Sequence, residues 1–229
     1  MKRAAELFTF ELCSSRSPLI EQTWQTCSEP EPEPSFISTA ATNWEMVVTR
    51  QRGRARLTVR GPETKASAAP IPADAEFFGI QFTLGTFMPG LPLSRLVDGD
   101  LTLPQTTSTS FWLDGTGWEL PGPDNADVFV ARLARAGLLV HDPVVAATVQ
   151  GEAASLSRRS VERRVSRATG LTLGTIEQIR RAERAVGLLG SGLSPLAVAE
   201  QAGYADQPHL TRALRRFTGR TPAQVARGA

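Results

Sequence analysis

Apolar and polar residues alternate along much of the first half of the chain. Residues 44–49 and 55–60 are two β-prone runs, and the second alternates small or basic residues with apolar ones. Between them lies the sequence Gln51-Arg52-Gly53-Arg54. A period of two on both sides of a short loop that contains glycine predicts a β-hairpin.

Short β-prone runs continue to about residue 120, at 76–82, 101–103 and 110–113, and turns rich in proline and glycine separate them. This pattern favours a mainly β structure for residues 1–120, either a sandwich or a small barrel. Residues 28–35 alternate proline with glutamate, which favours an extended conformation, so we expect a surface loop there.

The period changes at Asp124, where apolar residues begin to follow helical spacing. Asp124 or Asn125 can cap a first helix, and Gly137 can end it. Farther along, a capping side chain precedes a proline three times, at Asp142-Pro143, Ser194-Pro195 and Thr221-Pro222.

Other signals complete the helix assignment. Gln224 follows Thr221 by three residues, the spacing of a capping box, and Gly170 and Gly203 are expected stops. Together these signals predict an all-helical region with helices at about 143–151, 158–169, 173–190, 195–202, 207–218 and 222–227.

Two of these helices have an apolar back and a cationic front. In 158–169, Val161, Val165 and Ala168 share one face, and the opposite face holds Arg159, Arg163 and Ser166. In 207–218, the apolar face comprises Leu210, Ala213, Leu214 and Phe217, and the opposite face comprises Pro208, Arg212 and Arg215. A charged helix face is often merely solvated, but two such helices in one region favour a common function.

The segment before the second of these helices predicts a helix-turn-helix unit. It supplies a short helix at 195–202, a glycine at Gly203 and an aromatic anchor at Tyr204. In that motif the second helix enters the major groove of DNA with its amino-terminal end first. Arginine can bond O6 and N7 of guanine together, and glutamine pairs similarly with adenine. Arg159, Arg163, Arg212 and Gln207 are therefore candidate base readers.

The helix at 173–190 has a length suited to joining two such units. It spans roughly 27 Å at 1.5 Å per residue, and major grooves on one side of DNA recur about every 34 Å. A single chain could therefore place two recognition helices in successive grooves.

Charge divides the chain into two parts. Residues 1–151 carry 12 basic and 17 acidic side chains, a net charge of −5, whereas residues 152–229 carry 13 and 6, a net charge of +7. A basic domain beside an acidic one indicates that the carboxy-terminal part meets a polyanion and that the other part has a different role. Cys13 and Cys27 form no CxxC pair, and no apolar run is long enough to span a bilayer, so we expect a cytoplasmic protein with no membrane partner.

These features resemble the DNA-binding domain of the AraC/XylS family of bacterial transcription regulators. Its first half is matched by Ser157, Arg159, Val161, Arg163 and Gly170. Its second half is matched by Ala199, Gly203, Tyr204, Asp206, Leu210, Thr211, Arg212, Arg216, Phe217, Gly219, Thr221 and Pro222. Residues 144–156 must supply the first helix and turn, where Gln150 and Gly151 replace the leucine and alanine that the family prefers.

The resemblance implies roles for individual residues. Base contacts at the first site would be made by Arg159, Glu162 and Arg163, and at the second by Gln207, His209, Thr211 and Arg212. Phosphate contacts would be made by Ser157, Thr175, Arg180, Arg215 and Arg216. Two of these residues have alternatives, because His209 could simply lie on the helix surface and Glu162 could pair with Arg158 or Arg159 along its own helix.

The β region resembles the cupin-like sensor domain that often precedes this DNA-binding domain, chiefly in residues 77–85. The predicted fold class is thus α+β, with a β-rich sensor or dimerisation domain at 1–123, a linker helix region at 124–141 and a helical DNA-binding domain at 142–229. Trp44, Phe78, Phe82 and Trp112 are candidates for an effector pocket, although aromatic residues in a β domain are usually core. We expect no cofactor and no metal, since both histidines, His141 and His209, lie outside the β region.

Three functions compete. The first is a sequence-specific regulator, which the resemblance implies to be an activator at promoter DNA, with RNA polymerase, a small-molecule effector and a second copy as possible partners. The second is a cupin enzyme or a repair alkyltransferase fused to this domain, but no P-loop, G-x-S-x-G, S-x-x-K, H-E-x-x-H or Pro-Cys-His pattern is present. The third is a protein-interaction module or an architectural DNA binder with little sequence preference.

Overall fold

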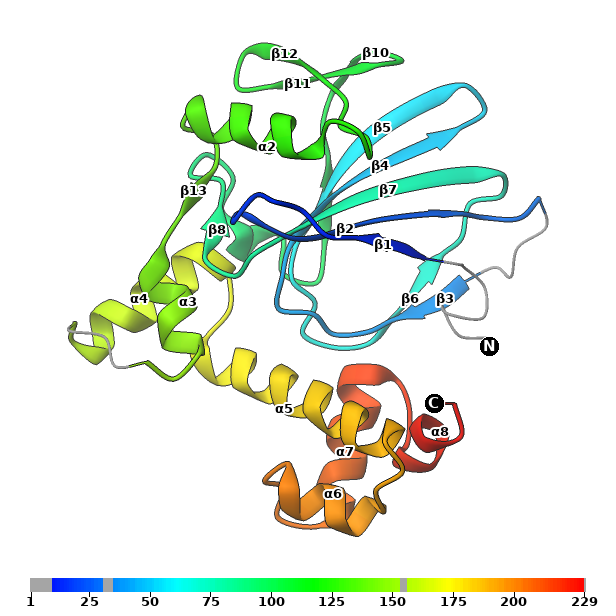
Figure 1. Cartoon of the computed structure of the whole chain (residues 1–229), viewed down its shortest axis with the longest axis vertical. Coiled ribbons are helices and arrows are strands. Elements are labelled where there is room, and N and C mark those ends of the chain that lie inside the picture. Colours follow the sequence, from blue (N-terminus) through cyan, green and yellow to red (C-terminus); the bar gives the residue numbers. More distant parts are fainter. Residues whose placement is uncertain (1–9, 31–34, 153–155, 229) are drawn as a thin grey trace.

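The computed structural model describes residues 10–30, 35–152 and 156–228 (Figure 1). A β domain precedes a helical domain, which confirms the predicted fold class. Its strands are β1 (Glu11–Cys13), β2 (Ile20–Cys27), β3 (Ser35–Ser38), β4 (Glu45–Gln51), β5 (Arg54–Arg60), β6 (Ser67–Pro70), β7 (Ala75–Phe82), β8 (Thr86–Phe87), β9 (Asp100–Thr102), β10 (Gln105–Thr107), β11 (Ser110–Leu113), β12 (Thr116–Glu119) and β13 (Val140–His141). The expected loop at 28–35 lies partly outside the described residues.

The main sheet has six antiparallel strands in the order β1-β2-β7-β4-β5-β9. The predicted hairpin is confirmed as β4 and β5, which pair from Glu45↔Arg60 to Gln51↔Arg54. Its two central residues, Arg52 and Gly53, have φ values of 49° and 72°. Positive φ at both positions is the geometry of a type I′ turn, whose twist matches that of the flanking strands.

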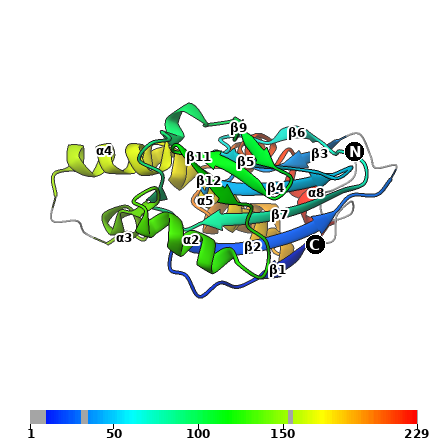
Figure 2. The same cartoon turned by 90° about the horizontal axis from the view of Figure 1, so that it is seen from above.

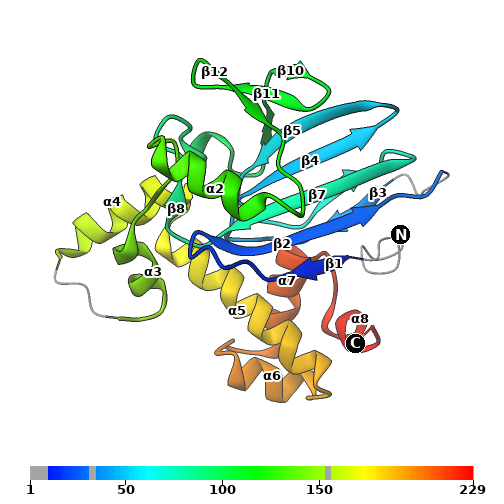
Figure 3. The ribbon, with the colours of Figure 1, turned by 45° about the horizontal axis from the view of Figure 1, so that its top comes forward.

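Three smaller sheets surround this one. β10, β11 and β12 form a meander that packs on helix α2 (Ala126–Arg135), where Phe111 and Trp118 meet Phe129 edge to face. β3 pairs with β6, and β8 pairs with β13. The β3–β6 ribbon and the β8–β13 pair lie on the side of the sheet that faces the helical domain (Figures 1 and 3).

The β domain has a packed aromatic core. Trp44 and Phe82 stack with ring centroids 4.0 Å apart, and both are buried with Met46 and Ile80. The indole Nε1 of Trp44 donates a hydrogen bond to the carbonyl of Thr86. Stacking of the two rings, together with a hydrogen bond from the buried indole N–H, contributes to the stability of the fold.

The helical domain contains α3 (Pro143–Val149), α4 (Arg158–Thr169), α5 (Leu173–Gly190), α6 (Pro195–Gln201), α7 (Gln207–Thr218) and α8 (Pro222–Ala226), within a residue or two of every predicted helix. Side-chain caps begin these helices at Asp142, Ser157, Thr172, Ser194, Asp206 and Thr221. Thr221 and Gln224 form the predicted capping box. Asn125 precedes α2 but does not cap it, because its side chain accepts from the backbone of Gly122 instead.

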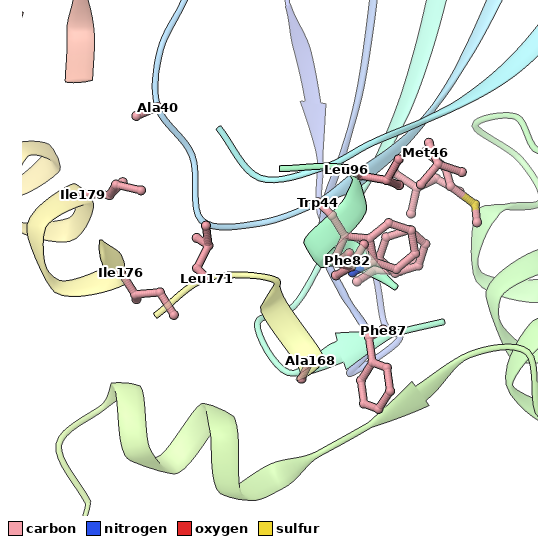
Figure 4. Packing of buried hydrophobic residues seen from close by; sticks show 14 of the residues in the cluster. Ala40, Trp44, Met46, Phe82, Phe87, Leu96, Ala168, Leu171, Ile176 and Ile179 are labelled. Carbon is pink, nitrogen blue, oxygen red and sulfur yellow. The ribbon is translucent and has the colours of Figure 1, made fainter. Parts of the chain in front are cut away.

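The two domains share one apolar core. Ala168 and Leu171, from the end of α4 and the link that follows it, are buried between Ile176 of α5 and the core around Trp44 (Figure 4). A short 3-10 helix, η1 (Leu93–Arg95), completes the junction from the β side. Burial of apolar surface across the junction stabilises one relative placement of the domains.

The second face of the main sheet holds a half-buried carboxylate, that of Glu45. The indole of Trp24 on β2 crosses over Gly79 of β7 and donates to Glu45 of β4 at 2.9 Å, and Arg60 approaches the same carboxylate at 3.6 Å. Burial raises the pKa of Glu45 above its ordinary value, and the charge of Arg60 and the hydrogen bond from Trp24 oppose this effect.

Gly79 is expected to tolerate no side chain. A Cβ built at Gly79 would lie 2.0 Å from the Trp24 indole, whereas one built at Gly117 of β12 would meet nothing nearer than 4.0 Å. We expect Gly79→Ala to lower the free energy of unfolding by about 1–3 kcal/mol through overpacking, and Gly117→Ala to cost much less. Urea unfolding of both variants tests this, and equal losses would contradict it.

Glu45 should make stability depend on pH in a defined direction. A carboxyl whose pKa is higher in the folded state holds its proton more tightly when folded, so its contribution to stability falls as the pH rises through that pKa. The free energy of unfolding of the native protein relative to Glu45→Gln should therefore decline as the pH rises above 4.5, the ordinary value. Urea titrations of the pair across this range measure it, and a difference that grows with pH would refute the expectation.

Candidate nucleic-acid interface

α4 presents the first of the two cationic faces. Ser157 caps its start by accepting from the backbone of Ser160, and Gly170 ends it with a φ of 74°. Val161, Val165 and Ala168 are buried. The predicted base readers Arg159, Glu162 and Arg163 are all exposed on the opposite face.

α7 is built in the same way. Asp206 caps it by accepting from the backbone of His209, and Gly219 ends it with a φ of 70°. Its buried face comprises Leu210, Leu214, Phe217 and Thr218. Gln207, Arg212, Arg215 and Arg216 are exposed. Both helices therefore have the division into an apolar and a cationic face that the sequence predicts.

Several candidate residues already have partners within the protein. Glu162 pairs with Arg158 at 2.9 Å, which is one of the two alternatives open from the sequence. The Thr211 hydroxyl donates to the carbonyl of Gln207, and the His209 ring packs edge to face on Tyr204. An exposed ion pair of this kind is worth little in water, so Glu162 remains available to other partners.

The residues predicted to contact phosphates differ in whether their side chains already have partners within the protein. Arg180 donates to the carbonyl of Val149 and so ties α5 to the end of α3. The hydroxyl of Thr175 lies 2.9 Å from that of Thr172, within the cap of α5. By contrast, the Arg215 side chain has no partner among the described residues, and the Arg216 guanidinium lies 5.0 Å from the ring of Phe217.

The two helix-turn-helix units differ in their turns. Five residues, 202–206, separate α6 from α7, and the Tyr204 backbone N–H donates to the carbonyl of Ala199. Eight residues, 150–157, separate α3 from α4, and residues 153–155 lie outside the described part. An open groove of about 790 Å³ lies between α4 and the start of α5, lined in part by Glu152, Glu162 and Glu177.

The helices are arranged around α5. α3 and α6 lie on one side of it, and the recognition helices α4 and α7 lie on the other (Figure 3). The carboxyl-terminal ends of α4 and α7 both meet the β domain, so their amino-terminal ends are the free ones. This is the polarity with which a recognition helix enters a groove.

The end of α7 is completed by backbone groups of the β domain. The Ala66 N–H donates to the carbonyl of Arg216 at 2.7 Å, and the Ala40 N–H donates to that of Phe217 at 2.8 Å. The last carbonyls of a helix have no partner within it, so these two bonds act as an external cap. Ala40 and Ala66 carry no side-chain signal that could have indicated this role from the sequence.

The end of α4 is held by side chains and by close packing. The Arg167 guanidinium lies 5.5 Å from the ring of Phe87, and Gly170 packs on the backbone of Leu93 and Ser94. Near the start of the domain, Arg164 bonds both carboxylate oxygens of Asp142, whose own N–H donates to Gly85 of the β domain. Both recognition helices are thus fixed to the β domain.

The proposed effector residues are not gathered around one cavity. Trp44 and Phe82 lie in the core, Trp112 is 47% exposed on β11, and Phe78 lines an open groove at one end of the main sheet. Within the described ranges no group of three or more histidine, cysteine, aspartate or glutamate residues is placed to hold a metal ion. Over the same ranges, no helix is both long and apolar enough to cross a membrane.

The close approach at Gly170 leads to a prediction with a matched control. A Cβ at Gly170 would lie 2.8 Å from backbone atoms of Leu93 and Ser94, whereas a Cβ at Gly192, which also has positive φ, would meet nothing within 4 Å. Alanine strains both sites similarly, and only Gly170→Ala also forces the domains apart. We expect it to lose about 1–3 kcal/mol more stability than Gly192→Ala in urea unfolding. Equal losses would show that the backbone around Leu93 and Ser94 can shift to accommodate a side chain at position 170.

Comparisons with known proteins identify the helical region. Residues 151–228, which include α4 to α8, match a family model described as a helix-turn-helix domain. A search of curated proteins gave no match.

Solved structures of ToxT from Vibrio cholerae resemble the whole chain weakly. A P21 crystal form has 9% identity and a TM-score of 0.40, with 95% of this chain and 98% of that one covered. ToxT from strain O395 has 8% identity and a TM-score of 0.41, with 96% and 97% covered. The same protein bound to (E)-4-(8-methylnaphthalen-1-yl)but-3-enoic acid has 9% identity and a TM-score of 0.41, with 95% and 98% covered. Likenesses at this level do not establish a shared fold, so the assignment depends on the family model and on the geometry of α4 to α8: residues 151–228 match a helix-turn-helix domain.

Proposed function

We propose that the chain is a sequence-specific transcription regulator that binds double-stranded DNA with α4 and α7 in successive major grooves. The observation that carries this proposal is the pair of cationic helix faces, both solvent-exposed, on one side of α5 within a helix-turn-helix domain (Figure 3). The contacts between the described part of the β domain and these helices lie at their carboxyl-terminal ends, at Arg167 and Gly170 of α4 and at Arg216, Phe217 and Gly219 of α7.

Specific binding would depend on the exposed arginines on the cationic faces of α4 and α7. Arg159 and Arg163 on α4 and Arg212 on α7 form no ion pair among the described residues, so their planar donors are free to bond a guanine edge in pairs. Gln207, at the amino-terminal end of α7, would pair with an adenine. His209 and Thr211 are partly engaged within the protein and would make secondary contacts.

Phosphate contacts would supply most of the affinity. Arg215 and Arg216 extend the cationic face of α7 toward its carboxyl-terminal end. Each phosphate that a basic side chain neutralises releases counterions, so binding should weaken steeply as salt rises. The net charge of +7 on residues 152–229 supports the same expectation.

The β domain would serve as a sensor or a dimerisation module. Its groove at the end of the main sheet, with Phe78 in the wall, is one place where a small-molecule effector could bind. Activation through RNA polymerase is the outcome that the AraC resemblance implies, and it forms part of the proposal.

Base-reading arginines should affect specificity as well as affinity. We expect Arg163→Ala and Arg212→Ala each to weaken binding to a selected operator by about 1–3 kcal/mol and to relax the preference at one base pair. Operators would be selected from genomic fragments with the purified full chain. Binding titrations against single-base variants at two salt concentrations would then measure both effects.

Arg227→Ala provides the control, because it removes one charge from the residue that follows α8, outside both recognition helices. It should leave the base preference unchanged. If the native protein binds scrambled DNA as tightly as the selected operator, the chain is an architectural binder. If it binds neither, the domain serves protein interaction and the proposal is wrong.

A further inference from the structure

One face of the β4–β5 hairpin carries a hollow of about 570 Å³ that arginines surround. It is lined by Thr49, Gln51, Arg52, Arg54, Ala55 and Arg56. Arg54 and Arg56 lie on the same face of β5, about 7 Å apart at the rise of an antiparallel strand. The three arginines are exposed, and none of them forms an ion pair with another described residue. Within the described part of the chain, none of the lining residues is acidic.

The wall that β4 contributes to the hollow is polar and largely fixed. Thr49 is only 6% exposed, and its hydroxyl makes no hydrogen bond with another described residue. Gln51 is held in place, because its Nε2 donates to the carbonyl of Ala73 at 2.6 Å. Buried hydroxyls usually have a hydrogen-bond partner, so the Thr49 hydroxyl is a donor that a ligand in the hollow can use.

The turn of the hairpin keeps an arginine where the backbone disfavours one. Arg52 has a φ of 49°, and the other three non-glycine residues with positive φ in the described ranges are aspartates. Glycine, asparagine and aspartate are the residues that accept this conformation readily. A disfavoured conformation that persists at an exposed, charged side chain indicates that the side chain has a role.

This hollow is separate from the other sites of the protein. Successive residues of a strand point to opposite faces of a sheet. Val48 and Arg50 therefore line the groove beside Phe78 on one face of β4, and Thr49 and Gln51 line the hollow on the other. Figure 1 shows the hairpin loop at the end of the main sheet that points away from the helical domain, and in Figure 2 the sheet extends away from α4.

The hollow fits phosphate better than carboxylate. A single arginine fork satisfies both oxygens of a carboxylate, whereas here three arginines and a hydroxyl surround the same space. A phosphate ester carries a charge of about −1.5 to −2 at neutral pH and three acceptor oxygens. The volume also lies within the range of small-molecule sites, roughly 300–1,000 Å³, so the hollow can hold more than one phosphate group.

We propose that this hollow binds the phosphate groups of a phosphorylated ligand. Arg54 and Arg56 donate in pairs to the phosphate oxygens, the Thr49 hydroxyl donates from the floor, and Arg52 covers the open side. A free small molecule such as a nucleoside triphosphate and the backbone of a nucleic acid both offer these oxygens. The site acts independently of base reading by α4 and α7.

Protection of arginine side chains tests the site in the native full chain. Phenylglyoxal modifies free guanidinium groups, and mass spectrometry locates the modified residues. Inorganic triphosphate should slow the modification of Arg54 and Arg56 at least about threefold through the bonds it forms with them. Arg50, on the other face of the same hairpin, should react at its original rate. Succinate at equal ionic strength should protect none of these residues.

Variants separate this site from the general attraction of a basic chain for anions. Arg54→Gln with Arg56→Gln removes two lining charges, and Thr49→Val removes the hydroxyl at nearly constant volume. In isothermal titration calorimetry with inorganic triphosphate, the first variant should bind at least about tenfold more weakly and the second about threefold. Arg16→Gln with Arg135→Gln is the matched control, because both arginines are exposed outside the hollow, and it should bind like the native chain.

The same variants identify the source of the phosphate groups. Titration with an unselected DNA duplex compares the Arg54→Gln, Arg56→Gln variant with the matched control. A loss of duplex affinity in the hairpin variant alone assigns the site to a nucleic-acid backbone. A loss confined to triphosphate assigns it to a free small molecule.

Three results would overturn the proposal: equal protection of Arg50 and Arg54, succinate that protects as well as triphosphate, or a hairpin variant that binds both probes as the matched control does. None of these results bears on the base preference that the Arg163 and Arg212 variants measure. Failure of the phosphate site and failure of the regulator function are therefore distinguishable.

Discussion

The geometry of the two recognition helices depends on how their carboxyl-terminal ends meet the β domain. An isolated helix leaves its last carbonyls without partners, and in α7 two of these bond the backbone of Ala40 and Ala66. Among the described residues no such bond is made at the end of α4, but Gly170 lies so close to η1 that a side chain would collide with its backbone. Backbone contacts of this kind fix position more tightly than flexible surface side chains do.

The distance between α4 and α7 is therefore not set by α5 alone. α5 joins the two units in sequence, and the β domain joins them a second time in space, through η1 at one end and the segments around Ala40 and Ala66 at the other. The buried residues Ala168 and Leu171 make this second connection part of the apolar core. A packed core deforms in discrete steps rather than continuously, so a change in the β domain that moved these segments relative to η1 would alter the angle between the helices.

The helical domain could be predicted from sequence almost residue by residue, because its signals are local. A cap such as Asp206 bonds a backbone group three residues away, and a glycine such as Gly219 ends a helix through its own backbone conformation. The β domain could be predicted only in part. β2 mixes polar and apolar residues on both faces and exists because β7 pairs with it over its whole length. The external cap of α7 could not be predicted at all, since it uses backbone donors of two alanines.

The two helix-turn-helix units hold their first helix in place through different contacts. In the second unit, Tyr204 and the bond from its backbone to Ala199 hold a five-residue turn closed. The first unit has eight residues between α3 and α4, and residues 153–155 among them lie outside the described part. Arg164 forms an ion pair with Asp142 at the start of α3, and Arg180 donates a hydrogen bond to the carbonyl of Val149 at its end. Since the Asp142 N–H also donates to the carbonyl of Gly85, α3 is aligned by the β domain and by α5.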